Sequence, residues 1–249
     1  MRHAAPLACV VGGLVVLPTG TARERPVVSL SASPARLVTE PGRAQVIALR
    51  NFASSPASVS ARAGGVALDL RGRPRLTGRT AASSWLGLSP RELSVGPGGT
   101  AELQVEARVP RSAEPGDHHA VVLLATRTTE ADGVGVRMRI GVRVVVRVPG
   151  RVVRRLVVRG LGVRRSGRAR VLEVALQNAG NVTETFPSGR LAVVLRMRGR
   201  ATRLLARRRE LLPRSRAVVS VVYRGRHRGV AGATIEIGGR AVRTFRIRV

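Results

Sequence analysis

The chain has 249 residues, and 44% of them are hydrophobic, which is the composition of a folded protein and excludes wholesale disorder. It carries 44 basic residues against 14 acidic ones, and all of the basic residues are arginine because the sequence contains no lysine. The single cysteine is Cys9, so a chain that loses its first residues would have no disulfide, thiol nucleophile or cysteine metal cage. The length suggests one or two domains, whose stability comes from packing alone.

The beginning of the chain has the pattern of a signal peptide for export. A short positive start is followed by apolar residues over 4–17, and Gly20 and Ala22 provide the small residues of a cleavage site. An uncleaved membrane anchor and lipidation of Cys9 are the alternatives, but the apolar run is shorter than the ~18–20 residues that span a bilayer. We therefore expect residues 1–22 to be a signal peptide and the protein to be secreted or held in the cell envelope.

Alternation of apolar and polar residues dominates the rest of the chain. It is clearest over residues 100–109 and 136–148, and shorter alternating runs occupy 170–178, 217–223 and 241–249. A period of two is typical of half-buried β-strands, and turns rich in glycine and proline separate the runs. The sequence therefore predicts an all-β fold of two consecutive immunoglobulin-like β-sandwiches.

Two segments have a helix-like pattern, and one turn marks a boundary between domains. Residues 81–86 can form a brief helical turn, and residues 201–212 have a helix-like pattern, although a pair of strands is preferred there. The long alternating run ends at Pro149-Gly150, where we place a domain boundary. The predicted domains are residues 27–148 and residues 149–249, each near the ~100 residues of an immunoglobulin-like domain.

Positive charge is concentrated in the second predicted domain. The first domain holds 16 arginines and nine acids, a net charge of +7, whereas the second holds 25 arginines and four acids, a net charge of +21. An anionic partner for the second domain is one interpretation, and an evenly solvated basic surface is the other. Arginine suits phosphate because its planar fork can bond two oxygens. The candidate contacts with an anionic polymer are Arg151, Arg154, Arg155, Arg164, Arg165, Arg168, Arg170, Arg207, Arg208 and Arg209.

Adjacent acidic and histidine residues raise the question of a metal or proton-transfer site at Asp117, His118 and His119. Pro115-Gly116 predicts a turn, and the apolar run that follows the histidines predicts a strand. Successive side chains of a strand point to opposite faces, so the two histidines cannot hold one metal as neighbours. We expect a turn that leads into a strand, and no metal site.

The order of motifs around this turn resembles a known family. Trp85-Leu86-Gly87-Leu88-Ser89-Pro90 is followed by a glycine-rich turn, an alternating strand, Val109-Pro110 and Glu114-Pro115-Gly116-Asp117-His118. This order resembles secreted bacterial immunoglobulin-like domains, nearest the peptidoglycan-binding domain of WxL-interacting proteins and more distantly the PapD-like pilus chaperones. Residues 172–195 are similar to the strand pair that follows in such proteins. The motif residues are Trp85, Pro90, Gly98, Pro110, Pro115, Gly116, Asn178, Gly180 and Asn181.

The resemblance implies a secreted, non-catalytic surface protein, and its motif residues are expected to form turns and core. For Trp85, packing in the core is favoured over stacking on a sugar. The sequence itself shows no paired carboxylates, no Ser/His/Asp set and no nucleotide-binding loop. We therefore expect no enzyme, cofactor or metal, and no specific nucleic-acid binding, because one Trp, one Tyr and three Phe give few rings for base stacking.

Two functions remain open at this point. The first is a cell-envelope binding or scaffold protein that contacts an anionic cell-wall polymer or an envelope protein, with contact to a membrane surface also open. The second is a periplasmic chaperone-like assembly factor that acts by β-strand addition, in which an edge strand lends backbone and apolar side chains to a partner. The expected apolar stripe is Met138, Ile140, Val142, Val144 and Val146.

Overall fold

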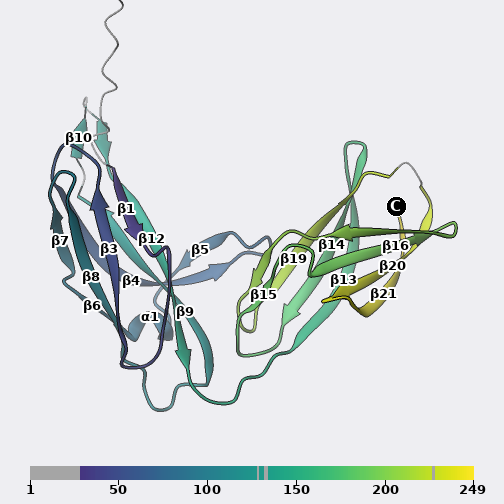
Figure 1. Ribbon diagram of the computed structural model, residues 1–249, viewed down its shortest axis with the longest axis horizontal. Helices are drawn as coiled ribbons and strands as arrows, with labels where there is room; N and C mark the ends of the chain where they lie inside the picture. Colours follow the sequence, from purple (N-terminus) through teal and green to yellow (C-terminus); the bar gives the residue numbers. More distant parts are fainter. Residues whose placement is uncertain (1–28, 128, 132–133, 226–227) are drawn as a thin grey trace, which may run out of the picture.

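The structure is a computed structural model that describes residues 29–127, 129–131, 134–225 and 228–249. The expected signal peptide at residues 1–22 lies outside the described residues. Two β-sandwiches follow one another along the chain and form a bent molecule, as Figure 1 shows, so the predicted fold class is confirmed. We call them the first domain, from β1 to β12, and the second domain, from β13 to β21.

The first domain packs two main sheets against each other. One sheet has the order β1-β3-β8-β6, with the strands β1 (Leu30–Ser33), β3 (Ala44–Asn51), β8 (Thr100–Ala107) and β6 (Leu86–Ser89). The other has the order β2-β12-β9-β4-β5, with β2 (Arg36–Thr39), β12 (Arg139–Val148), β9 (Gly116–Thr126), β4 (Ala57–Leu68) and β5 (Pro74–Thr77). Further short elements are β7 (Glu92–Val95), which pairs with β4, the helix α1 (Ala81–Ser84), and the hairpin of β10 (Thr129–Ala131) with β11 (Val134–Val136).

The second domain repeats this plan with different strands. One sheet has the order β13-β14-β19, with β13 (Leu156–Ser166), β14 (Ala169–Asn178) and β19 (Arg216–Tyr223). The other has the order β17-β16-β20-β21, with β17 (Arg200–Leu205), β16 (Leu191–Met197), β20 (Val230–Ile237) and β21 (Arg240–Arg248). The short strands β15 (Glu184–Phe186) and β18 (Arg209–Leu211) pair with each other.

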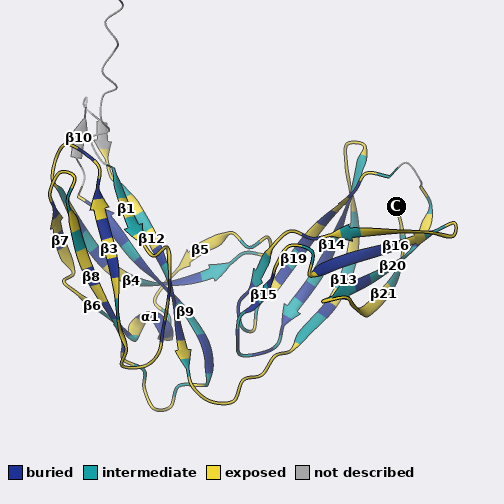
Figure 2. Ribbon diagram, viewed as in Figure 1, coloured by how far each residue is buried: buried dark blue, intermediate teal, exposed yellow. Residues whose placement is uncertain are grey.

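Each domain has its own apolar core, and alternation along the strands builds it. In β8, Leu103, Val105 and Ala107 are fully buried while the residues between them face outward. Figure 2 shows the buried residues gathered inside each sandwich. One cluster of buried residues ends at Val146 and the other begins at Val158, on either side of Pro149-Gly150. The boundary at Pro149-Gly150 itself stays a prediction.

Three local predictions can be compared with the strands and helix. The expected helical turn is α1, capped by Thr80, whose side chain accepts a hydrogen bond from the Ser83 amide. The expected turn and strand at Gly116 are confirmed as the start of β9. Residues 201–212 form two strands instead of a helix, as preferred; β17 pairs with β16, and β18 pairs with β15. Local alternation identifies strands without specifying their partners.

Candidate functional site

The two domains are joined at Asp117, a buried carboxylate at the start of β9. Its Oδ1 accepts a hydrogen bond from Arg147 Nε at 2.9 Å, and its Oδ2 accepts one from the Thr183 amide of the second domain at 2.9 Å. Burial alone would raise the pKa of Asp117, but the hydrogen bonds from Arg147 and Thr183 hold that pKa below its usual value. Asp117 therefore stays charged and fixes the two domains to each other.

Asn181 completes the joint from the second domain. Its Nδ2 donates to the carbonyl oxygens of Pro115 and Arg151, both at 2.8 Å, and its Oδ1 accepts from the Val153 amide at 2.7 Å. Gly116 approaches this residue so closely that a Cβ would lie 2.1 Å from the Asn181 carbonyl oxygen, and its φ of +129° also favours glycine. Motif residues that the sequence placed in separate turns thus meet at one joint.

The other motif residues lie in the turns and core of the two domains. Trp85 packs against the first core, and its ring meets that of His118 edge-on with centroids 4.8 Å apart. Gly98 and Pro110 lie in turns: Gly98 has a positive φ, and the Pro110 carbonyl accepts a hydrogen bond from the Ala113 amide. Pro90 directly follows the end of β6. In the second domain, Asn178 is fully buried, and its Oδ1 accepts from the Gly180 amide.

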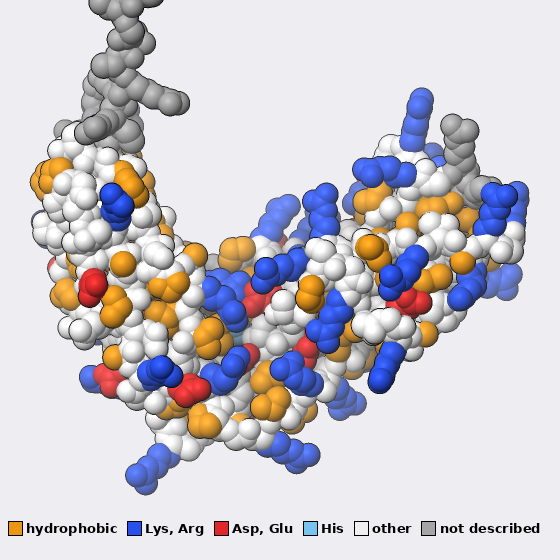
Figure 3. Space-filling view, viewed as in Figure 1, with side chains coloured by type: hydrophobic (Ala, Val, Ile, Leu, Met, Phe, Trp, Pro, Cys, Tyr) orange, Lys and Arg blue, Asp and Glu red, His pale blue; other side chains and the backbone are white. Residues whose placement is uncertain are grey.

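The hairpin between β4 and β5 forms a second bridge between the domains, and Figure 1 shows it crossing on the concave side. The Leu70 carbonyl at its tip accepts from the Val218 amide of β19 and from Arg209 Nη2, at 2.6 and 2.8 Å. Arg209 also donates to the Arg71 carbonyl. Asp69 shapes the tip by accepting from the Arg71 and Arg73 amides. The space-filling view in Figure 3 shows the surface hollowed between the two domains, and this hairpin bridges the cleft.

Two arginines of the first domain converge on one carboxylate inside this cleft. Arg36 on β2 and Arg143 on β12 are directly opposite each other in a parallel strand pair. Arg143 Nη2 lies 2.7 and 2.8 Å from the two carboxylate oxygens of Glu210, which belongs to β18 of the second domain. Arg36 Nη2 lies 3.9 Å from the same carboxylate. Two cations that face one acid leave an excess positive charge, so this place can bind a further carboxylate.

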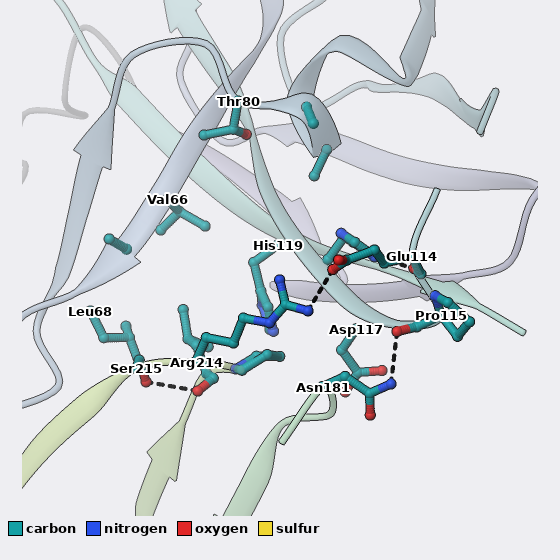
Figure 4. Close-up of a pocket in the computed structure, with 16 residues that line it drawn as sticks. Val66, Leu68, Thr80, Glu114, Pro115, Asp117, His119, Asn181, Arg214 and Ser215 are labelled. Atoms are coloured by element: carbon teal, nitrogen blue, oxygen red, sulfur yellow. Dashed lines mark hydrogen bonds and ion pairs between the residues drawn. The ribbon is translucent and has the colours of Figure 1, made fainter. Parts of the chain in front are cut away.

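His119 lies beside these arginines at the domain interface. Its Nε2 is 2.8 Å from Thr183 Oγ1, whereas its Nδ1 is buried and has no partner among the described residues. Burial and then the nearby charge of Arg143 lower the pKa of His119 from 6.5 to about 4, so the ring is neutral at neutral pH. Figure 4 shows His119 beside a cavity of about 390 Å³ between the domains. His118 points to the opposite face and packs on Trp85, as the strand period predicts.

The outer edge of β12 is unpaired just before Arg143. β2 pairs with β12 over residues 143–146, and no described strand covers the same side of β12 from Arg139 to Val142. The Met138 carbonyl faces β9, because it accepts a hydrogen bond from the Thr126 amide of that strand. The Arg143 amide faces the outer side, because it donates a hydrogen bond to the Ala35 carbonyl. Backbone groups alternate in direction along a strand, so the amides and carbonyls of Arg139 and Gly141 face the open side.

The predicted apolar stripe on β12 is wrong for most of its length. Val142, Val144 and Val146 are fully buried in the core of their own domain and cannot be lent to a partner. The alternation identified an apolar face correctly, but that face belongs to the first domain. Met138 and Ile140 are partly buried, and Val136 before them is 41% exposed. These are the described apolar residues that lie beside the open edge.

The arginines proposed as contacts with an anionic polymer lie in three places: the linker at 151–155, the β13–β14 hairpin at 164–170, and residues 207–209. Arg164 joins the last group around a cavity of about 230 Å³. Two other hairpin arginines border a separate cavity of about 560 Å³. Figure 3 shows arginines distributed over much of the visible face of the second domain. The structure therefore does not unite the ten residues in one site.

Sequence reasoning missed Arg36, Arg143 and Glu210, because no local pattern distinguishes them from the other charged residues. One signal was visible. Arginine occupies positions 137, 139, 143 and 147 of the long alternating run, and Gly141 and Val145 interrupt this row. Among the described residues, no group of three or more His, Cys, Asp or Glu side chains could hold a metal ion. The helix that the structure describes is too short to cross a membrane.

No protein-family model matches the chain, and no curated protein matches its sequence. Solved structures do share its fold. A structure described as a chaperone–tip adhesin complex of CFA/I fimbriae biogenesis superimposes with a TM-score of 0.50 at 7% identity, over 88% of this chain and 98% of that one. The class 5 fimbriae chaperone CfaA gives a TM-score of 0.50 at 8% identity over the same shares of the two chains.

These similarities correct two expectations. They support the pilus-chaperone part of the sequence resemblance at the level of the fold, and they give no support to the WxL-interacting part. The expectation of an anionic cell-wall polymer as partner is wrong, because the similar structures are chaperones and one of them is in complex with an adhesin, which is a protein. The arginines of the second domain therefore lose the partner that their charge suggested.

Proposed function

We propose that this protein is a non-catalytic, exported assembly factor that holds a client protein by β-strand addition at the open edge of β12. The observation that carries the proposal is the position of the Arg36–Arg143 pair at the end of that edge, where the pair already binds a carboxylate. The chaperone fold of the similar structures supports the same function.

The open edge supplies the backbone part of recognition. Arg139 and Gly141 direct amides and carbonyls outward, and an extended client segment can pair with them as an added strand. Val136, Met138 and Ile140 lie along the same edge and keep part of their apolar surface exposed. Side chains of the client that cover this surface would leave water, which favours binding.

The arginine pair supplies direction and end recognition. It lies at the carboxyl-terminal end of the open edge, so a client whose terminal carboxylate reaches it runs parallel to β12, as β2 does. A hydrogen bond to a charged group contributes about 1.5–3 kcal/mol. Glu210 already occupies Arg143, whereas Arg36 is more exposed and lies at a longer distance from that carboxylate. A client carboxylate would share the pair with Glu210 or displace it.

Synthetic peptides test this function on the chain without its first 28 residues. The probe has twelve residues that alternate valine with serine or threonine and ends in a free carboxylate; a second version ends in an amide. Fluorescence anisotropy should show that the free acid binds about tenfold more tightly than the amide, because the amide loses one charge-assisted interaction.

Variants identify the place of binding. Arg36→Ala combined with Arg143→Ala should remove the preference for the free acid, whereas Arg200→Ala on the exposed β17 strand should keep it. Equal affinity for the acid and the amide in the wild-type protein would contradict the proposed end recognition. Binding of neither peptide would contradict strand addition itself.

A further inference from the structure

A groove of about 700 Å³ lies on the face of the β12-β9-β4 sheet that looks into the cleft. Its floor is apolar and includes Val66 of β4, Leu76 of β5, and Val121 and Leu123 of β9. Its volume is in the range of ~300–1,000 Å³ that is typical of ligand pockets, so a large side chain fits inside. The groove lies entirely within the first domain and runs toward the open edge of β12.

Gly141 connects this groove to the open edge. The side chains of Arg139 and Arg143 stand on the same face of β12, and Gly141 between them has none. A Cβ at Gly141 would lie 3.3 Å from Val121 Cγ2, which is closer than most such contacts. The glycine therefore leaves a gap between the two arginine side chains, which we call the notch, and Val121 packs against the glycine at its base. A side chain from a neighbouring strand can contact the floor of the groove there.

The border of the groove is positively charged. Four arginines line it, at positions 62, 137, 139 and 143, and among the described residues no acidic side chain does. Arg143 is paired with Glu210, and Arg137 Nε donates to the Thr126 carbonyl. The guanidinium groups of Arg62 and Arg139 have no hydrogen bond or ion pair with any described residue. These two cations beside an apolar floor are complementary to an acidic residue next to a large apolar one.

We infer that this groove is a specificity site for the client strand and takes one large apolar side chain through the notch at Gly141. The inference rests on the proposed strand addition at β12. Side chains of an added strand alternate in direction, so about half of them face the groove and the others face the side of Val136, Met138 and Ile140. An acidic residue on the groove side of the client pairs with Arg62 or Arg139. The preferred client segment therefore has a bulky apolar residue and an acid on one face.

A substitution scan of the free-acid peptide tests this site. Phenylalanine replaces one residue at a time in this peptide, and all other positions keep the valine, serine or threonine of the parent peptide. We expect affinity to rise about tenfold at one position, or at two positions separated by one residue, because burial of one aromatic side chain supplies a gain of this order. A glutamate two residues from the responsive position should add a further gain that decreases with salt.

Two variants test binding in the groove independently of strand pairing at the edge of β12. Gly141→Val fills the notch and should abolish the gain from phenylalanine while the parent peptide binds as before; Gly160→Val, at a strand glycine with open space around it, is the matched control. A side chain at position 141 presses on Val121 and can shift β12 itself, so Arg62→Ala combined with Arg139→Ala provides a second test. This double variant should abolish the gain from glutamate and keep the gain from phenylalanine.

The outcomes distinguish the inference from the proposed function. If the free-acid peptide binds with its carboxylate preference but phenylalanine changes nothing at any position, the groove is not a client site and strand addition still stands. If no peptide binds, both proposals fail. Sedimentation of the wild-type protein without peptide checks a second copy as occupant: a dimer that dissociates in Gly141→Val would overturn the assignment to a client.

Discussion

The arginines of the interdomain cleft and those of the second-domain surface differ in how the fold uses them. Arg143 and Arg147 face carboxylates that are largely buried, and each lies at a joint between the domains. Most arginines of the second domain extend into solvent from strand faces and turns, as Figure 3 shows for the visible face. The comparison teaches that a local arrangement of few charges can define a site where a larger total charge does not.

The largest effect on the free energy of unfolding should come from Asp117, the buried carboxylate that joins the domains. Asp117→Ala removes a carboxylate whose side chain is 2% exposed, and it leaves Arg147 and the Thr183 amide without their partner. We expect the free energy of unfolding to fall by about 3 kcal/mol. Glu173→Ala removes a more exposed partner of Arg164 and should cost less than about 1 kcal/mol. Urea denaturation of both variants measures the difference, and equal costs would remove the distinction between the two regions.

Burial of His119 at the domain interface should make the stability of the protein depend on pH. The unfolded chain takes up a proton at this ring below pH 6.5, whereas the folded chain does so only near pH 4, so stability is lost as the pH falls through this window. The loss should approach about 3 kcal/mol. Asp117, whose pKa is lowered, adds a further loss only below about pH 3.8.

Urea titrations between pH 4 and pH 7 can measure this loss. His119→Gln should flatten the dependence of stability on pH in this window, and His118→Gln, on the opposite face of β9, should leave it in place. An unchanged pH dependence in His119→Gln would show that the interface does not hold this ring neutral.

Glu210→Gln sharpens the comparison through binding. The substitution removes the internal carboxylate that occupies Arg143, so we expect the free-acid peptide to bind several-fold more tightly at low salt. Glu236→Gln, which frees Arg203 on the sheet of the second domain, adds the same charge elsewhere and should change affinity little. Weaker binding by Glu210→Gln would mean that this carboxylate helps to form the site instead of competing for it.

The smallest effect should come from the arginine-rich surface. Arg207→Ala combined with Arg208→Ala removes two charges from the second domain, and neither side chain has a hydrogen bond or ion pair with a described residue. We expect the free energy of unfolding to change by less than about 0.5 kcal/mol and peptide affinity to stay the same at physiological salt. A large loss of peptide binding would return these arginines to the functional site.

The sequence was sufficient for the fold class because the alternation in each strand is a local property. The apolar positions of β8 and β14 could be read directly, and they are the positions that the structure buries. Strand pairing is a non-local property, so the sequence predicted two strands at β17 and β18 but not their partners β16 and β15. The same limit explains the buried stripe of β12, because alternation cannot tell which sheet covers an apolar face.

The site was harder to predict because its parts are distant in the chain. Arg36, Arg143 and Glu210 are joined by a parallel strand pair and a contact between domains, and no local spacing encodes either one. Gly141 was the exception, since an interrupted row of arginines is visible in the sequence. Net charge directed attention to the second domain because it counts residues without regard to their partners.

The most direct test of the account is amide hydrogen exchange along β12 with the free-acid peptide bound. An added strand pairs with outward amides, so the account predicts slower exchange at Arg139 and Gly141 in the complex. At the same peptide concentration this protection should be weaker when the peptide ends in an amide or when Arg36 and Arg143 are replaced by alanine. Protection at the edge strands β17 or β21 of the second domain, with none at Arg139 and Gly141, would contradict it.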